Sequence, residues 1–149
     1  MIQTVTVFGE AYSKKNSPMV IKLGNRYSIR PSNNYTKWEK DAISQLKSRY
    51  EPYKGDYPCA FGIYFFRKTR RTFDFNNLGH GIHDALTKTG IIPDDDIKHV
   101  LPYPILADGW EVDKENPRVV GVLSSIEESP MGNGNMQDFY DLVHNQCPF

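Results

Sequence analysis

The run CAFGIYFF, at positions 59–66, limits most strongly what this chain can fold into. It is aromatic and apolar throughout, a pattern typical of a β-strand that is covered on both faces. Such a strand requires a sheet with other elements packed on it. A chain of 149 residues suits a single core of this kind, since domains commonly run to roughly 100–200 residues.

Hydrophobic periodicity indicates what surrounds this strand. Alternating or apolar runs predict three further strands, at 2–8, 97–103 and 118–126. Apolar residues at helical spacing predict three helices, at 32–50, 77–88 and 138–146. Turn residues indicate a basic loop or hairpin, a polar turn-rich stretch and a flexible linker, at 11–31, 106–117 and 129–135 respectively. Thr36 and Glu39 offer a capping box for the first helix.

These elements predict one domain over residues 1–149, of the α/β (α+β) class, with a mixed β-sheet and packed helices. Residues 127–149 are expected to form a variable C-terminal extension. No apolar run approaches the ~20 residues of a membrane span, and the N-terminus lacks the order of a signal peptide, so we expect a cytoplasmic protein. Cys59 and Cys147 lack the spacing of a zinc site and are interpreted as free thiols.

Charge is balanced overall but unevenly distributed. Residues 1–71 contain 14 basic and 5 acidic side chains, whereas residues 72–149 contain 4 basic and 13 acidic ones. One interpretation is that one surface attracts phosphate while another gathers carboxylates around a cation. The alternative is that two oppositely charged patches face each other in the folded protein. Net charge alone indicates neither a nucleic-acid-binding protein nor a membrane-surface protein.

Carboxylates occur at both ends of the predicted helix 77–88, with Asp74 before it and Asp94, Asp95 and Asp96 after it. If Asp74 ends one strand and the aspartates begin the next, strands paired at about 4.8 Å bring these acids together. Close carboxylates favour a cation between them, and Mg²⁺ takes carboxylate and phosphate oxygens. The structural alternatives are a solvated turn for the aspartates and helix capping for Asp74.

Basic residues suited to a phosphate backbone lie in two segments. They are Lys14, Lys15, Arg67, Lys68, Arg70 and Arg71. Carboxylates, a cation and a basic rim together describe a metal-dependent nuclease, although each feature alone is common on protein surfaces. His80 and His83 have i, i+3 spacing, whereas a two-histidine metal site prefers i, i+4, so no histidine metal site is expected.

The order of residues from 74 to 96 resembles the core motif of the RusA family of Holliday junction resolvases. That motif runs Asp-x-Asp-Asn-Leu-x-Lys, then a helix with Asp-Ala-Leu, then Gly and Asp-Asp. The sequence has DFNNLGH at 74–80, DALTKTG at 84–90 and DDD at 94–96, at matching spacing and without a gap. A less specific similarity extends over residues 2–126.

The resemblance implies a homodimeric mixed α/β nuclease, of a family often found in prophages. Its two Mg²⁺-dependent sites would nick opposing strands of a four-way DNA junction in recombination and repair. By position, Asp74 and Asp95 would be catalytic, metal-binding acids, and Asp94 would support Asp95. Asn76 occupies the position of a second acid and would be a neutral metal ligand. His80 occupies the position of a lysine and would steady the phosphate or leaving group.

Two further functions stay open at this point. The replacements at Asn76 and His80 predict weaker metal binding, so a junction-binding relative with weak or no catalysis is the first alternative. A small protein-interaction domain, suggested by the aromatic content and the C-terminal tail, is the second.

Overall fold

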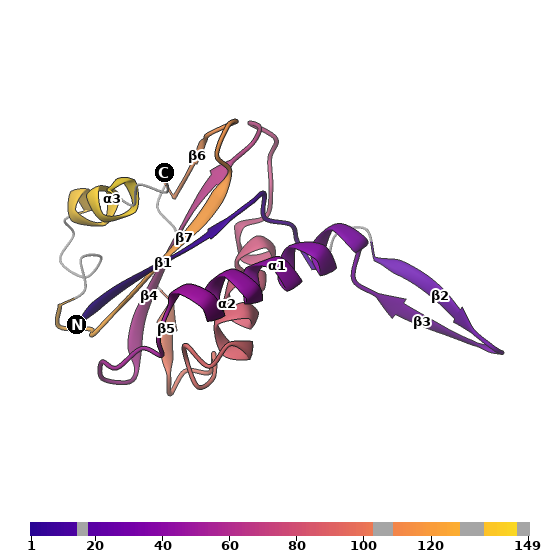
Figure 1. Ribbon diagram of the computed structural model, residues 1–149, viewed down its shortest axis with the longest axis horizontal. Coiled ribbons are helices and arrows are strands. Elements are labelled where there is room, and N and C mark those ends of the chain that lie inside the picture. The colour runs from indigo at the N-terminus through magenta and orange to yellow at the C-terminus, as the bar shows by residue number, and fades with distance from the viewer. Residues whose placement is uncertain (15–17, 103–108, 129–135, 146–149) are drawn as a thin grey trace.

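A mixed β-sheet forms the centre of the structure, a computed structural model that describes residues 1–14, 18–102, 109–128 and 136–145. Within these residues the sheet has five strands (Figure 1). They are β1 (Ile2–Phe8), β4 (Cys59–Arg67), β5 (Val100–Pro102), β6 (Trp110–Val112) and β7 (Arg118–Ser124). β7 lies between β1 and β4 and is antiparallel to both, while β5 and β6 run parallel to β4 along its other edge.

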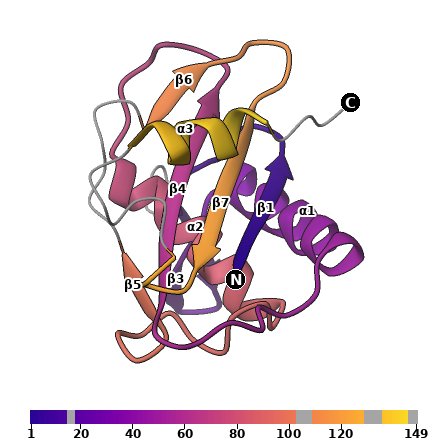
Figure 2. The same ribbon diagram turned by 90° about the vertical axis from the view of Figure 1, so that its left-hand side faces the viewer.

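Helices cover both faces of this sheet. α1 (Asn33–Arg49) and α2 (Phe75–Lys88) lie on one face, and α3 (Met136–His144) lies on the other (Figures 1 and 2). β4 contributes to both cores, with Phe61 and Phe65 packed in the α1 and α2 cluster and Tyr64 and Phe66 in the α3 cluster. The prediction of a strand covered on both faces is therefore confirmed, as is the α+β class with a mixed sheet.

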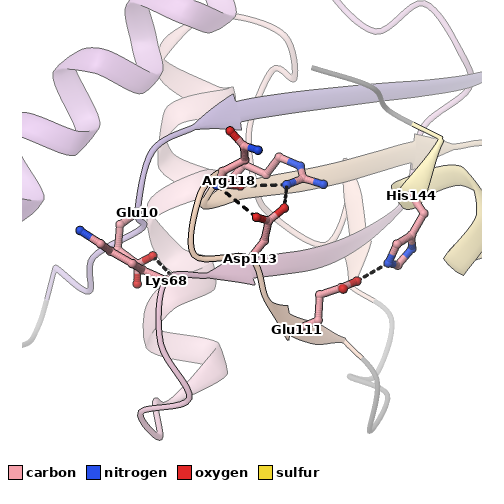
Figure 3. Close-up of polar contacts among 7 residues, drawn as sticks. Glu10, Lys68, Glu111, Asp113, Arg118 and His144 are labelled. Atoms are coloured by element: carbon pink, nitrogen blue, oxygen red, sulfur yellow. Dashed lines mark hydrogen bonds and ion pairs between the residues drawn. The ribbon is translucent and has the colours of Figure 1, made fainter. Parts of the chain in front are cut away.

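α3 is fixed to the sheet by apolar and polar contacts. Phe139 and Val143 are buried against the sheet, and the His144 imidazole contacts the Glu111 carboxylate on β6 (Figure 3). On β7, the Arg118 guanidinium donates to Asp113 at 2.8 Å and lies 3.6 Å from the centre of the Phe66 ring. The C-terminal helix is thus part of the packed domain.

Most predicted elements are confirmed, with three corrections. The predicted strand at 97–103 begins only at Val100, because a turn in which His99 and Val100 donate to the Asp96 carbonyl precedes it. The stretch 106–117 contains β6, which the sequence did not indicate. The capping box is wrong: Ser32 is the N-cap, and its side chain accepts from the Tyr35 amide at 3.2 Å. The predicted linker at 129–135 lies outside the described residues.

The N-terminal basic segment is a hairpin in its second half. β2 (Met19–Leu23) and β3 (Arg26–Arg30) pair antiparallel and project from the body of the protein (Figure 1). Gly24 in the turn has a φ of 62°, which glycine adopts without steric cost. Among the described residues, no helix is both long and apolar enough to cross a membrane.

The outer edge of β1 is covered by side chains of α1 and the residue after it. The Gln45 side chain accepts from the Phe8 amide at 2.8 Å and donates to the Phe8 carbonyl at 2.9 Å. The Thr6 amide donates to the Tyr50 hydroxyl at 2.9 Å. The outward amides of Thr6 and Phe8 and the Phe8 carbonyl therefore have hydrogen-bond partners without a further strand.

The two helices on the first face approach closely at Gly81 of α2. A β-carbon built there would lie 2.8 Å from the Trp38 ring and 3.3 Å from the Tyr35 ring, and both rings are buried. At Gly79 the nearest atom, Ile63 Cδ1, would lie at an ordinary 3.5 Å. Gly81 is thus required for packing between α1 and α2, whereas Gly79 is not.

We expect Gly81→Ala to destabilise the protein and Gly79→Ala to stabilise it. Both changes gain about 1 kcal/mol of helix propensity, but overpacking against the rigid Trp38 ring costs about 1–3 kcal/mol at position 81 alone. Urea unfolding of the two variants should therefore separate their midpoints in opposite directions from wild type. Equal stabilisation by both changes would show that α1 and α2 separate without cost.

Candidate functional site

A groove lies where the base of the hairpin meets α2. It has a volume of about 550 Å³, and its walls combine cations, an acid and apolar residues. The lining residues are Lys14, Pro18, Ile29, Arg30, Pro31, His80 and Asp84. Lys14 Nζ is 3.5 Å from Asp84 Oδ2, while His80 and Arg30 are exposed. Three cationic or protonatable groups thus share one concave surface with a carboxylate, which suits a phosphate-bearing ligand.

α2 carries the first part of the predicted site. Asp74 is its N-cap, and its Oδ1 accepts from the Asn77 amide at 3.1 Å. The capping interpretation of Asp74 is therefore confirmed, although its carboxylate stays exposed to solvent. Asn76 and His80 are exposed, and their spacing of four residues places them on the same side of the helix.

The three aspartates lie in the loop before β5 and differ in their contacts. Asp94 Oδ1 accepts from the Asp95 amide at 2.8 Å. Asp96 accepts from the Lys98 amide at 3.0 Å and lies 2.6 Å from His99 Nδ1, and the His99 hydrogen bond lowers the pKa of Asp96. Within the described part of the chain, no hydrogen bond or ion pair engages the Asp95 carboxylate. Asp95 is the acid of this loop that is available for a ligand.

The predicted route for bringing Asp74 and Asp95 together is wrong. β4 ends at Arg67, seven residues before Asp74, and β5 starts at Val100 opposite Cys59, the first residue of β4. Asp74 follows the C-terminal end of β4, whereas Asp95 precedes the N-terminal end of β5. Because the two strands are parallel, these two ends lie at opposite ends of the pair. Both acids instead lie near α2. Asp74 caps its N-terminus, and Asp95 lies close enough to His83 of this helix for its charge to act on the His83 pKa.

His83 is a half-buried residue of α2 that the sequence analysis did not include in the site. Its ring meets the Phe61 ring edge to face, with centroids 4.7 Å apart. Burial lowers its pKa below the ordinary value of 6.5, and this outweighs the opposing charges of Asp95 and Asp84. His83 is therefore neutral at pH 7.

The burial of His83 predicts a loss of stability in mild acid. Because its pKa is lower in the folded than in the unfolded state, the unfolded chain binds more protons as the pH falls through about 6.5. The melting temperature should therefore fall between pH 7.5 and pH 5.5, a range above the ordinary carboxylate values. A His83→Phe variant, which keeps a ring against Phe61, should show a smaller fall. An identical fall in both proteins would assign the effect to other groups.

A second polar network joins α1 to the C-terminal end of α2. The Tyr35 hydroxyl donates to Glu39 at 2.7 Å, and Lys88 Nζ donates to Glu39 at 2.9 Å. Burial acts to raise the pKa of Glu39, but the hydrogen bonds from Lys88 and Tyr35 outweigh it and lower that pKa. Glu39 therefore stays charged, and this network ties the C-terminal end of α2 to α1.

The predicted DNA-binding residues divide into two groups. Arg67 is 12% exposed, donates from Nε to Glu10 at 2.9 Å and lies 4.5 Å from the centre of the Phe73 ring, so its guanidinium is engaged within the protein. The other Glu10 oxygen accepts from the Lys68 amide at 2.8 Å (Figure 3). The side chains of Lys14, Lys68, Arg70 and Arg71 are exposed. Lys15 lies outside the described residues.

Sequence reasoning missed two groove residues, Arg30 and Asp84, as well as His83. Asp84 had a usable signal, because it follows His80 by four residues and therefore shares its side of α2. Arg30 had none, since its approach to α2 depends on how the hairpin is placed.

The acids predicted to hold magnesium are distributed along α2 and its flanking loops. In the described residues, no group of three or more His, Cys, Asp or Glu side chains is arranged to hold a metal ion. Magnesium needs fewer protein ligands, since one or two carboxylates, waters and substrate phosphates commonly hold it. The exposed carboxylates of Asp74 and Asp95 and the amide oxygen of Asn76 fit that donor set chemically.

Comparison with known proteins does not assign a family. No family model matches this chain, and no curated protein matches it.

Proposed function

We propose that this protein is a magnesium-dependent, structure-selective endodeoxyribonuclease that resolves four-way DNA junctions in recombination and repair. The observation that carries the proposal is the groove, where Lys14, Arg30 and His80 meet the acid-bearing helix α2. The choice of a junction as substrate, action as a homodimer in the cytoplasm and a prophage origin rest on the motif at 74–96.

The cationic side chains bind the substrate. Lys14 and Arg30 attract a phosphate backbone into the groove, and the exposed Arg70 and Arg71 extend that attraction beyond it. The carboxylate of Asp84, 3.5 Å from Lys14 Nζ, fixes where this cation lies. Binding should therefore be strongly salt-dependent, because each phosphate contact releases counterions.

Asp74, Asn76 and Asp95 would hold the magnesium ion. When bound, the ion supplies an activated water and stabilises charge on the phosphate oxygens. Asn76 contributes a neutral oxygen, which keeps a ligand but removes one negative charge from the site. His80, exposed in the groove, donates a hydrogen bond to the phosphate or to the leaving oxygen. Asp94, whose carboxylate accepts from the Asp95 amide, orients the segment that carries Asp95.

A second candidate is a protein that binds junctions without cutting them. It is favoured by one observation: the Asp74 carboxylate already accepts a hydrogen bond as the N-cap of α2. Asn76 and His80 also reduce charge where a nuclease benefits from it. In such a protein the groove and the exposed cations would still bind DNA, and only the cleavage of the phosphodiester bond would be lost.

Incubating the purified protein with labelled four-way junctions, linear duplex and single strands, with and without magnesium, separates the two candidates. Cleavage confined to junctions and dependent on magnesium is the expected result. No product at any pH between 6 and 9, together with metal-independent preference for junctions in a gel shift, would select the binding protein. Absence of DNA binding at low salt would exclude both and return attention to a protein-interaction domain.

A further inference from the structure

The β2–β3 hairpin exposes apolar side chains away from the body of the protein. None of the residues from Met19 to Arg30, all of which the structure describes, is buried. Val20, Tyr27 and Ile29 are 66%, 72% and 75% exposed. A two-stranded ribbon alone is marginally stable in water, so side chains of this kind are expected to meet a partner.

Both faces of the ribbon carry the same mixture of side chains. The cross-strand pairs Val20 with Ile29 and Lys22 with Tyr27 lie on one face. The pairs Leu23 with Arg26 and Met19 with Arg30 lie on the other. Each face therefore joins cations to apolar or aromatic groups. A partner that covers one face of the ribbon would leave the equivalent other face exposed to solvent. A partner with a channel, in which each wall contacts one face of the ribbon, would cover both faces.

The charge of the ribbon indicates what those walls are. Between Met19 and Arg30 there are three cations, Lys22, Arg26 and Arg30, and no carboxylate. The cations occur on both strands and both faces. A polyanion with two backbones on either side of a channel complements this arrangement. The major groove of B-DNA is such a channel, and its width of about 12 Å admits a two-stranded β-ribbon.

We infer that the β2–β3 ribbon inserts into the major groove of a duplex DNA arm, with Lys22 and Arg26 contacting the phosphates on its two sides. Tyr27 and Val20 contact sugars and base edges between them. The inference rests on the proposed function, because it names the element that grips an arm of the DNA substrate. Ile29 and Arg30, at the base of the ribbon, line the groove that contains His80 and Asp84. The ribbon therefore sets the distance between the bound DNA duplex and α2.

The test compares two charge-neutralising variants of the full chain. Lys22→Gln with Arg26→Gln removes two cations from the ribbon, outside the groove. Lys54→Gln with Lys98→Gln removes two exposed cations from the loops that precede β4 and β5. Binding to labelled duplex and junction is measured by fluorescence anisotropy over a range of salt. The ribbon variant should lose about 2 from the slope of log affinity against log salt, and roughly tenfold or more in affinity at 0.1 M salt. The loop variant should retain the wild-type slope.

Tyr27→Ala separates apolar contact from charge. It should weaken binding several-fold while leaving the salt slope unchanged, because it removes no cation. Amides of the ribbon should also gain protection from hydrogen exchange when duplex DNA is added. Near-identical circular dichroism of all variants is expected, since no ribbon residue is part of the core.

Each other result overturns the inference in a recognisable way. A ribbon variant with wild-type affinity and slope, from a protein that still binds or cuts junctions, refutes the ribbon contact and leaves the proposed function intact. A ribbon variant that loses dimer mass in light scattering but not DNA affinity shows that a second copy of the chain occupies the ribbon. A wild-type protein that binds no DNA removes the inference together with the proposed function.

Discussion

Asp95→Asn should lower the rate of magnesium-dependent junction cleavage by about 100-fold or more. Loss of residues that merely orient metal ligands commonly costs 10–100-fold, and a charged ligand matters at least as much. Asp95 is exposed, and within the described residues its carboxylate has no hydrogen bond or ion pair, so folding should be unaffected. Single-turnover cleavage of a labelled junction gives the rate, and a gel shift should show intact DNA binding.

Asp96→Asn is the matched control for this prediction, one residue away in the same loop. Its carboxylate already engages His99 and the Lys98 amide. The change should therefore lower the melting temperature and leave the cleavage rate close to that of wild type. Full cleavage by Asp95→Asn, or an equal loss in both variants, would show that the loop before β5 contributes no ligand to the chemistry.

The double change Asn76→Asp with His80→Lys should raise the cleavage rate more than the sum of the single effects on a logarithmic scale. Residues 76 and 80 are four apart on α2, so a new carboxylate and a new ammonium group are neighbours and hold each other in place. The carboxylate also lies in the first turn of α2, where the helix dipole favours negative charge by about 0.3–1 kcal/mol. We expect a gain of at least tenfold for the double variant.

The two single variants test why the effects of the two changes are expected to be coupled. A carboxylate at 76 without a magnesium ion repels DNA, and a lysine at 80 without its acid repels the ion, so each single change should help only modestly. Rates measured across a magnesium titration test this directly. A double variant slower than either single would show that Asn76 and His80 are adapted to each other.

The sequence best predicted the strands and helices in which the pattern of apolar residues continues over many positions. β4 and the buried stripe of α2 could be recognised because apolar residues repeat over nine and fourteen residues. β6 could not, since its three residues lie in a polar stretch and become a strand only by pairing with Phe65–Arg67 of β4. The sequence does not distinguish Thr36 from the true N-cap, Ser32, because both positions offer a hydroxyl at the start of the same periodic segment.

The candidate site was predicted as a set of residues but not as an arrangement. Motif spacing indicated Asp74, Asn76, His80 and Asp95, and the structure places all four on α2 or its flanking loops as exposed side chains. Strand ends do not bring Asp74 and Asp95 together, because β4 and β5 are parallel and the end of β4 lies far from the start of β5. Charge alone likewise could not show that Glu10, 57 positions from Arg67, engages its guanidinium.

The contacts of Gln45 and Tyr50 with β1 have a consequence for how two copies of this chain can assemble. An open strand edge is a template for another strand, through which sheets join between molecules and proteins aggregate. Here the outward amides of Thr6 and Phe8 are already satisfied by side chains. A dimer formed by continuing the sheet across β1 is therefore disfavoured. A strand added along this part of β1 would first have to displace Tyr50 and Gln45, so this edge resists β-type association.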